Sequence, residues 1–161
     1  MPPLETARLT LRAFTLDDAA FIVELLNDAD WLRFIGDRKV RSIDDAQTYL
    51  CNGPIAHEAK HGFALGAVQR SSDSALVGMC GLIRREGLDD VDLGYAFLPA
   101  YRGQGYAREA AEAWLARGFD RFGLKRIVPA HCTGWRAVNA LANAFGADAL
   151  VPSAVGRQFM F

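Results

Sequence analysis

Short segments of alternating hydrophobic and polar residues recur along the chain, and each predicts a strand with one buried face. Between residues 9 and 13, leucine and alanine side chains alternate with Thr10 and Arg12. Turns rich in Ser, Asp and Gly separate the central segments, which favours hairpins and antiparallel pairing. Similar patterns predict further strands over residues 63–69, 76–83, 91–98, 126–132, 148–151 and 157–161.

Helical periodicity marks the remaining segments. Thr15 with Asp18, and Ser42 with Asp45, match the spacing of helix N-caps. Glycines at 123 and 146 are typical of helix C-termini. These signals predict helices over residues 16–26, 42–50 with a ragged extension through 54–60, 105–122 and 137–145.

The order of these elements predicts an α/β fold in one domain covering residues 1–161. We expect a mixed, mostly antiparallel sheet of about seven strands, flanked by about four helices. The strand–helix–strand unit between Val91 and Cys132 predicts one parallel pair.

Composition narrows the class of protein. Hydrophobic residues make up 51% and charged residues 23% of the 161 residues, which is typical of a folded protein. The formal net charge of -1 argues against a general nucleic-acid binder, which is normally basic. We therefore expect no nucleic-acid partner, and either a monomer or a homodimer.

Cysteine usage and hydropathy predict a cytoplasmic protein. The chain has three widely spaced cysteines and no CxxC pair, so neither a disulfide framework nor a structural zinc site is expected. The start has no apolar signal-peptide core, and no apolar run is long enough to span a membrane. His57 and His61 share a helical spacing but lack a third ligand, so we expect no metal.

The segment Val91–Ala107, VDLGYAFLPAYRGQGYA, carries the main functional signal. It predicts a strand that stops at a proline, a glycine-bearing turn, and the start of a long helix. Small residues in the turn let backbone N–H groups converge at the positive end of a helix dipole. Such an arrangement favours an anion, and a diphosphate suits it.

Three phosphate-binding patterns compete for this turn. No GxxxxGK run followed by Ser or Thr exists, which excludes a P-loop. Gly103 and Gly105 lack the third glycine of a GxGxxG fingerprint, and Lys125 stands where an acid is expected. The third pattern, R/Q-x-x-G-x-G/A after a strand, is matched by Arg102, Gly105 and Ala107.

These residues resemble the GNAT superfamily of acyl-CoA-dependent N-acetyltransferases, and within it the ribosomal-protein-type (RimJ/RimL-like) N-terminal acetyltransferases. TARLTLRAFTLDDA is similar to the opening of that subfamily, and DLGYAFLPAYRGQGYAREA to its acetyl-CoA signature. Arg117-Gly118-Phe119 and the run from Gly123 to Ile127 resemble the end of the long helix and the next strand. The likeness covers nearly the whole chain in order.

The resemblance implies acetyl-CoA as co-substrate, lying where strand 91–98 splays from strand 126–132. It implies that backbone groups around Phe97 and Leu98 pair with the pantetheine arm. The N–H at about Leu98 would polarise the thioester carbonyl. It further implies that the pyrophosphate is held by the turn residues Arg102, Gly103, Gln104, Gly105, Tyr106 and Ala107.

Asp92 is the candidate general base, directly or through water. Alternation puts it on one face of its strand with Gly94 and Ala96, which leaves room for a substrate. The alternative is a solvated acid in the cluster Glu86, Asp89, Asp90 and Asp92. Tyr101 is a candidate acid, with packing as the alternative.

The chain departs from the family pattern downstream. Trp135 and Val138 stand where related sequences carry Asn and Ser, and Asn139 is a substitute cofactor contact one turn away. The expected function is acetyl transfer to a primary amine by direct attack in a ternary complex, with a protein N-terminus as acceptor. Three alternatives stay open: a small-molecule amine acceptor, a degenerate CoA-binding protein, and a dinucleotide-binding module.

Overall fold

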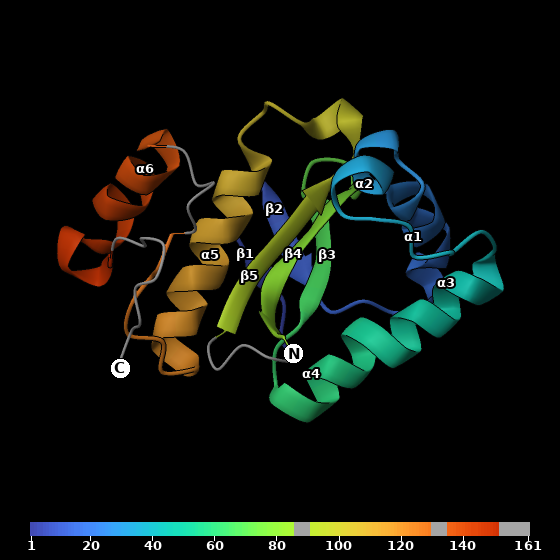
Figure 1. Cartoon of the computed structure of the whole chain (residues 1–161), viewed down its shortest axis with the longest axis horizontal. Helices are drawn as coiled ribbons and strands as arrows, with labels where there is room; N and C mark the ends of the chain where they lie inside the picture. The colour runs from blue at the N-terminus through green and yellow to red at the C-terminus, as the bar shows by residue number, and fades with distance from the viewer. Residues whose placement is uncertain (86–90, 130–134, 152–161) are drawn as a thin grey trace. The chain divides into compact units, whose positions relative to one another are not determined.

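A computed structural model describes residues 1–85, 91–129 and 135–151, and the backbone alone at 135–137 (Figure 1). The chain divides into two compact units, Met1–Leu115 and Ala116–Phe161. The first unit carries the sheet and the glycine-bearing turn.

The sheet of the first unit is antiparallel throughout. Its order is β1-β2-β3-β4-β5, so strands joined by hairpins lie side by side. Partners across β4 and β5 include Ile83 with Asp92 and Met79 with Ala96, and paired residues project from the same face. The strands are β1 Leu4–Glu5, β2 Leu9–Arg12, β3 Leu65–Arg70, β4 Leu76–Arg84 and β5 Val91–Phe97.

The expected sheet of about seven strands with one parallel pair is wrong, because the described residues form five antiparallel strands. Within 126–129 only Ile127 bridges, in parallel, to Leu150. Pro129 has no N–H to extend a ladder, which is a physical reason for so short a pairing. Residues 147–149 form a 3-10 turn instead of a strand, and residues 130–132 and 157–161 lie outside the described residues.

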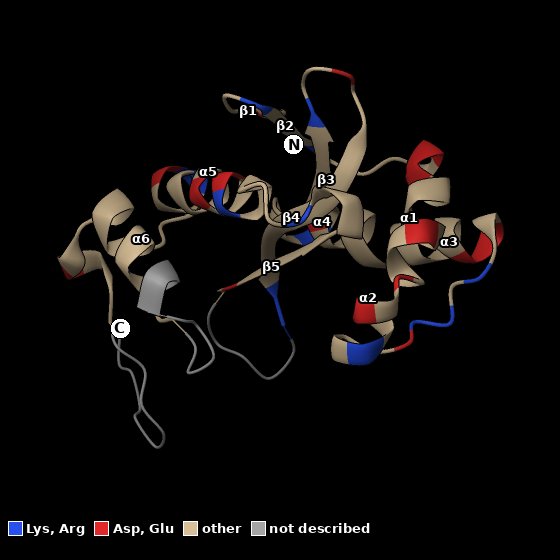
Figure 2. Ribbon diagram, turned by 90° about the horizontal axis from the view of Figure 1, so that it is seen from above, with Lys and Arg blue, Asp and Glu red and all other residues tan. Residues whose placement is uncertain are grey.

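One face of the sheet is covered by helices from the N-terminal half. Ile22, Leu25 and Leu50 are almost fully buried there and share a hydrophobic core with Met79 of β4. Figure 2 shows these helices on one side of the sheet and α5 on the other. The helices are α1 Ala19–Leu26, α2 Ala29–Phe34, α3 Ile43–Leu50, a π-helical segment Cys51–Ile55, α4 Ala56–His61 and α5 Tyr106–Arg121.

The predicted caps explain where two helices begin. Asp45 accepts hydrogen bonds from the N–H of Ser42, and Ser42 Oγ accepts one from the N–H of Asp45 at 3.1 Å. Before α1, Asp18 accepts from the N–H of Thr15 at 2.8 Å and from both Nη atoms of Arg12. The first turn of the predicted helix 16–26 is 3-10, and α1 follows it directly.

The second unit contains α6, Trp135–Phe145. Gly123 and Gly146 adopt positive φ angles of 68° and 84° after α5 and α6. Such angles suit glycine and end a helix, as the sequence predicts. The rings of Phe119 and Phe145 stack with centroids 5.6 Å apart.

Candidate functional site

The turn between β5 and α5 has an unusual backbone. After a 3-10 turn at Pro99–Tyr101, Gly103 and Gly105 adopt φ angles of 72° and 83°. Other residues rarely adopt such angles, so the two glycines permit this path. A Cβ on Gly103 would meet nothing within 4 Å, which leaves the space beside it open.

Backbone N–H groups are unused along this turn. None of the N–H groups of residues 103–108 donates to an acceptor in the described part of the chain. The first helical bond runs from the N–H of Glu109 to the carbonyl of Gly105, at 3.1 Å. We call the turn 102–107 the cradle loop, because free N–H groups at a helix start attract an anion.

The arginines around the cradle loop are held by carboxylates. Arg8 donates to Glu109 at 2.7 Å and to the carbonyl of Gln104 at 3.1 Å. Arg108 donates to Glu112, one turn further along α5. The attraction for an anion at this loop therefore comes mainly from the backbone.

Arg102 is the most heavily engaged of these side chains. Its guanidinium pairs with Asp28, the N-cap of α2, and with Asp30 within α2, and its Nε donates to the carbonyl of Phe97 at 2.8 Å. Burial by itself would raise the pKa of Asp28, but the hydrogen bonds from Arg102 and from the N–H of Trp31, together with the charge of Arg102, outweigh burial and lower that pKa. Arg102 therefore joins the cradle loop to α2 and to the end of β5.

A cavity of about 290 Å³ lies beside the cradle loop. Its walls come from the loop, from the end of β5 and from α2. Most of the lining is apolar or aromatic, which is typical of small-molecule sites. The lining residues are Leu25, Asp28, Asp30, Trp31, Phe34, Ile35, Tyr95, Ala96, Phe97, Tyr101, Arg102, Gly103, Gly105, Tyr106 and Ala107.

Backbone pairing at the end of β5 separates Phe97 from Leu98. The N–H of Leu98 donates to the carbonyl of Val77 at 3.0 Å, so it is occupied and not open for the polarising role that the resemblance implies. In an antiparallel ladder the next residue, Phe97, turns its backbone groups away from β4. The carbonyl of Phe97 accordingly meets Arg102 instead.

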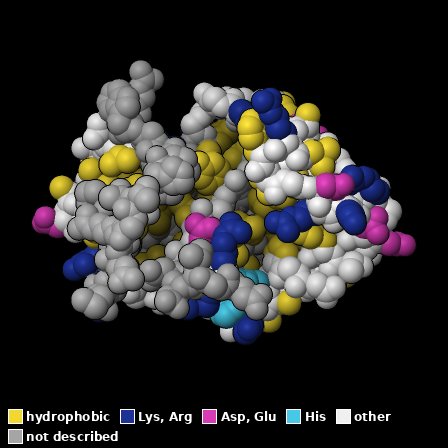
Figure 3. All heavy atoms as spheres, in the orientation of Figure 1, with side chains coloured by type: hydrophobic (Ala, Val, Ile, Leu, Met, Phe, Trp, Pro, Cys, Tyr) yellow, Lys and Arg dark blue, Asp and Glu magenta, His cyan; other side chains and the backbone are white. Residues whose placement is uncertain are grey.

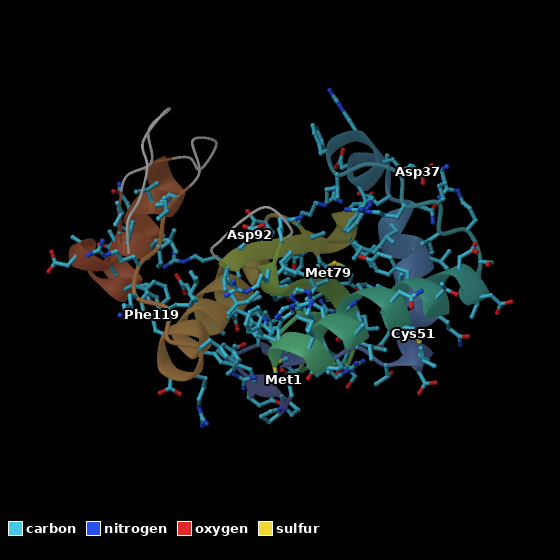
Figure 4. All side chains as sticks on the ribbon, turned by 60° about the horizontal axis from the view of Figure 1, so that its bottom comes forward. Met1, Asp37, Cys51, Met79, Asp92 and Phe119 are labelled. Carbon is cyan, nitrogen blue, oxygen red and sulfur yellow. The ribbon has the colours of Figure 1, made fainter. Side chains whose placement is uncertain are left out.

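Asp92 and Tyr101 lie toward opposite ends of β5. Asp92 is at its start, where its carboxylate pairs with Arg85 (Figure 4). Tyr101 follows the end of the strand and lines the cavity, with the guanidinium of Arg70 5.1 Å from its ring centroid. A rise of about 3.3 Å per residue puts Asp92 roughly 17 Å from Phe97. The structure therefore does not bring the two candidates together.

Several lining residues were not anticipated as site residues. Sequence reasoning left 27–41 irregular and missed α2, although Asp28 caps it by accepting from the N–H of Trp31. That Asp-x-x-Trp spacing was the available signal. No local sequence signal pointed to Tyr95, a residue that is 58% exposed, as part of the cavity lining. Asn139 is exposed on α6, in the second unit.

Neither a cluster of metal ligands nor a membrane-spanning helix is found among the described residues. Across residues 1–85, 91–129 and 135–151, no three His, Cys, Asp or Glu side chains cluster as metal ligands. None of the helices described there has the length and hydropathy needed to cross a bilayer.

The match to a protein-family model identifies the family of this chain. The model of the acetyltransferase (GNAT) domain matches residues 8–147, which include strands β2 to β5, the cradle loop and α6. The chain belongs to the GNAT acetyltransferase family. The resemblance predicted from the signature around residues 92–110 is thereby confirmed.

Individual relatives agree with this assignment. An uncharacterised N-acetyltransferase of Bacillus subtilis (strain 168), YoaA, is 28% identical over 99% of this chain and 89% of its own length. A GNAT acetyltransferase structure from Bacillus anthracis has a TM-score of 0.66 at 24% identity, covering 87% of this chain and 82% of that one. RimL, a ribosomal L7/L12 α-N-protein acetyltransferase solved with coenzyme A, has a TM-score of 0.66 at 16% identity, covering 88% and 81%.

GNAT proteins use acetyl-CoA, and the residues present in this GNAT domain suit that molecule. The diphosphate needs several converging N–H donors, and the unpartnered groups of 103–108 provide them. The open space beside Gly103 leaves room for the diphosphate to approach the backbone. The apolar cavity adjoining the loop accommodates the less polar arm.

Proposed function

We propose that this protein transfers the acetyl group of acetyl-CoA to a primary amine, by direct attack within a ternary complex. The cradle loop carries the proposal, because the N–H groups of residues 103–107 have no acceptor among the described residues and lie at the start of α5. The N–H of Arg102 is occupied, since it donates to the carbonyl of Pro99 at 3.2 Å. Acetyl-CoA supplies the activated thioester when it is bound. Everything else required of the protein is binding, orientation and movement of a proton.

The cofactor role falls on the backbone more than on side chains. Gly103, Gln104, Gly105, Tyr106 and Ala107 would hold the diphosphate through their N–H groups. Arg102 would act by positioning, since its guanidinium already ties the loop to α2.

The open edge of β5 would pair with the pantetheine arm. Phe97 turns its backbone groups toward this edge, and Tyr95 does so two residues earlier. The N–H of Leu98 is occupied by Val77. The N–H of Phe97 would therefore bind the arm, and that of Tyr95, about 10 Å along the strand from Asp92, would polarise the thioester carbonyl so that the amine attacks between Tyr95 and Asp92. Leu98 would serve the site through its buried side chain, which packs in the core.

Asp92 would take the proton from the amine. Amines are mostly protonated at neutral pH, so attack needs a base within hydrogen-bond reach or one water away. Asp92 shares its face of β5 with Gly94 and Ala96. The room that these small residues were expected to leave is filled at Gly94 by Ile83 and Leu65, so an acceptor would reach Asp92 from the side of Arg85. Its pairing with Arg85 orients the carboxylate. Tyr101 would contribute to the cofactor cavity and not to the proton transfer at Asp92.

The acceptor is proposed as a primary amine in general. The likeness to ribosomal-protein acetyltransferases, which is below 25% identity, supports the fold and only suggests a protein N-terminus. A CoA-binding protein without turnover is the second candidate, favoured by Trp135 and Val138 at positions where related sequences carry Asn and Ser. Cytoplasmic location and a monomeric or homodimeric state stay predictions.

Thiol release from acetyl-CoA with a panel of amines tests the proposal. We expect turnover by the wild type, and an Asp92→Asn variant whose kcat falls by about 100-fold or more, because general bases contribute that much. Its pH–rate profile should also lose the acid limb. Glu24→Gln, which removes an exposed carboxylate from α1, is the matched control and should behave as wild type.

Two results would redirect the assignment. Tight CoA binding without turnover of any amine would favour the CoA-binding candidate over the enzyme. Turnover with an unchanged pH profile in Asp92→Asn would keep the enzyme and remove Asp92 as its base.

A further inference from the structure

A second cavity, of about 650 Å³, lies between α4 and the end of β4. No residue of the cradle loop lines it, so it is separate from the cavity described above. Its floor is formed by Leu65 and Ile83, at the ends of β3 and β4. The volume falls within the range of small-molecule sites.

The lining of this cavity is basic. Lys60 from α4, Arg84 at the end of β4 and Arg85, which follows β4, contribute cationic side chains, and no Asp or Glu is among the described residues that line it. In Figure 3 the histidines lie beside Lys and Arg side chains at this end of the molecule. The one acidic residue of α4, Glu58, pairs with the ammonium of Met1. The cavity therefore favours a negatively charged ligand.

Two histidines of α4 add hydrogen-bond donors. The Nε2 atom of His57 accepts a hydrogen bond from the N–H of Arg84 at 3.2 Å, which places the ring proton on Nδ1. Burial, with help from His61 and Lys60, lowers the pKa of His57 and favours this neutral form. The rings of His57 and His61 lie 4.5 Å apart, so both border the same space.

The cavity is continuous with the face of β5 that carries Asp92. Arg85 lines the cavity and donates to Asp92, while Ile83 pairs with Asp92 across the ladder. An added Cβ on Gly94 would lie 3.0 Å from Ile83 and 3.1 Å from Leu65. Side chains of the cavity floor therefore cover Gly94, and the cavity meets β5 at Asp92.

We propose that this cavity binds an anionic group of the acetyl acceptor, so that the acceptor is a primary amine carrying a carboxylate or phosphate a few bonds away. The inference rests on the proposed function, in which Asp92 receives the proton of that amine. Lys60 would attract the anion, His57 and His61 would border it, and Arg85 would remain with Asp92. Polycationic amines would be repelled by the same residues.

Matched acceptors that differ only in charge test the inference. We expect kcat/KM to be at least about tenfold higher for β-alanine than for β-alaninamide, and for O-phosphoethanolamine than for ethanolamine. Amidated peptides beginning Ala-Asp-Glu or Ala-Asn-Gln show whether the anion comes from a peptide or from a small molecule. Equal kcat/KM within every pair would overturn the inference.

Variants locate the effect in this cavity. Lys60→Gln should raise KM for the anionic acceptor by about tenfold, which corresponds to about 1.4 kcal/mol. The KM for acetyl-CoA should not change. Lys39→Gln, which removes an exposed cation outside the cavity lining, is the control and should leave both KM values unchanged.

Direct binding separates this inference from the enzymatic proposal. Calorimetric titration of O-phosphoethanolamine into the CoA-loaded protein should give binding that Lys60→Gln weakens about tenfold. If O-phosphoethanolamine binds in this way but no amine is acetylated, the catalytic proposal is wrong and the anion site stands. If neutral amines are acetylated but O-phosphoethanolamine does not bind, the anion site is wrong and the catalytic proposal stands.

Discussion

Gly105 is the residue on which the cradle loop depends most directly. Its φ angle of 83° is strained for other residues, and an added Cβ would lie 3.4 Å from Arg8. Substitution Gly105→Glu would also bring a carboxylate to the point where a diphosphate is expected. We expect the Kd for CoA to rise by at least about 100-fold, because like charges and lost backbone geometry act together.

Two further variants separate the effect of the added charge from that of backbone strain. Calorimetry measures the Kd for CoA in each variant. Gly105→Ala retains the strain without the charge and should show a smaller loss. Gly123→Glu has a similar φ angle of 68° after α5 and should bind CoA normally. Unchanged affinity in Gly105→Glu would refute the assignment of the loop.

Asp18 is the one buried acidic residue among those described, with 4% of its surface exposed. Burial would raise its pKa, but hydrogen bonds from Arg12 and the N–H of Thr15 outweigh this and lower it. A lowered folded-state pKa gives stability that is present above the unfolded value, near 4, and is lost as pH falls through the folded value.

Asp18→Asn should therefore lower the free energy of unfolding at pH 7 by about 2–3 kcal/mol, because Arg12 would lose its charged partner. Urea titrations across pH 2–7 should show the gap between variant and wild type closing at the acid end. Asp17→Asn, its exposed neighbour, should follow the wild-type curve. A gap that persists below the folded pKa would contradict the ion-pair explanation.

At the scale of elements, α2 is a short helix that is anchored by a side chain of the cradle loop. It spans Ala29–Phe34, and two of its anchors, Asp28 and Asp30, bind Arg102 of the cradle loop. Arg102→Gln should therefore speed hydrogen exchange at the α2 amides and raise the Kd for CoA, since the cavity wall loosens.

Arg108→Gln is the control for this coupling. Its partner Glu112 lies on the same helix in an exposed pair, which contributes little. Exchange at α2 should not change in this variant. Equal exchange in Arg102→Gln and wild type would show that α2 is held by its packing alone.

Local patterns located most elements but not all. Strands β2 to β5 and helices α3, α5 and α6 fall close to the predicted ranges, because their periodicity, caps and turns are encoded by neighbouring residues. The predicted strand 126–132 gives only a bridge at Ile127 over its described part, because pairing needs a partner strand and Pro129 interrupts it. Helix α2 was missed although Asp28 and Trp31 mark its start, because six residues carry little periodicity and much of the helix's support comes from Arg102, which is distant in sequence.

At the scale of the whole molecule, CoA binding should appear as stability. A ligand present at 100 times its Kd raises the free energy of unfolding by about 2.7 kcal/mol. For a chain of this size that corresponds to a Tm increase of roughly 5–10 °C. We expect differential scanning calorimetry to show this shift for the wild type and for Asp92→Asn, but not for Gly105→Glu.

NADH at the same concentration is the control ligand. The sequence lacks the third glycine and the acidic residue of a dinucleotide site, so no shift is expected. An equal shift with NADH would favour a general diphosphate site over a CoA site.

The sequence by itself determined the family, the antiparallel hairpins and the position of the cradle loop. Each depends on residues close together in the chain: a strand, a proline, two glycines and a helix start. Only the tertiary structure decided which groups are already occupied. It showed Arg102 held by Asp28 and Asp30, the N–H of Leu98 held by Val77, and a basic cavity between α4 and β4. Those contacts join distant segments, and packing sets them.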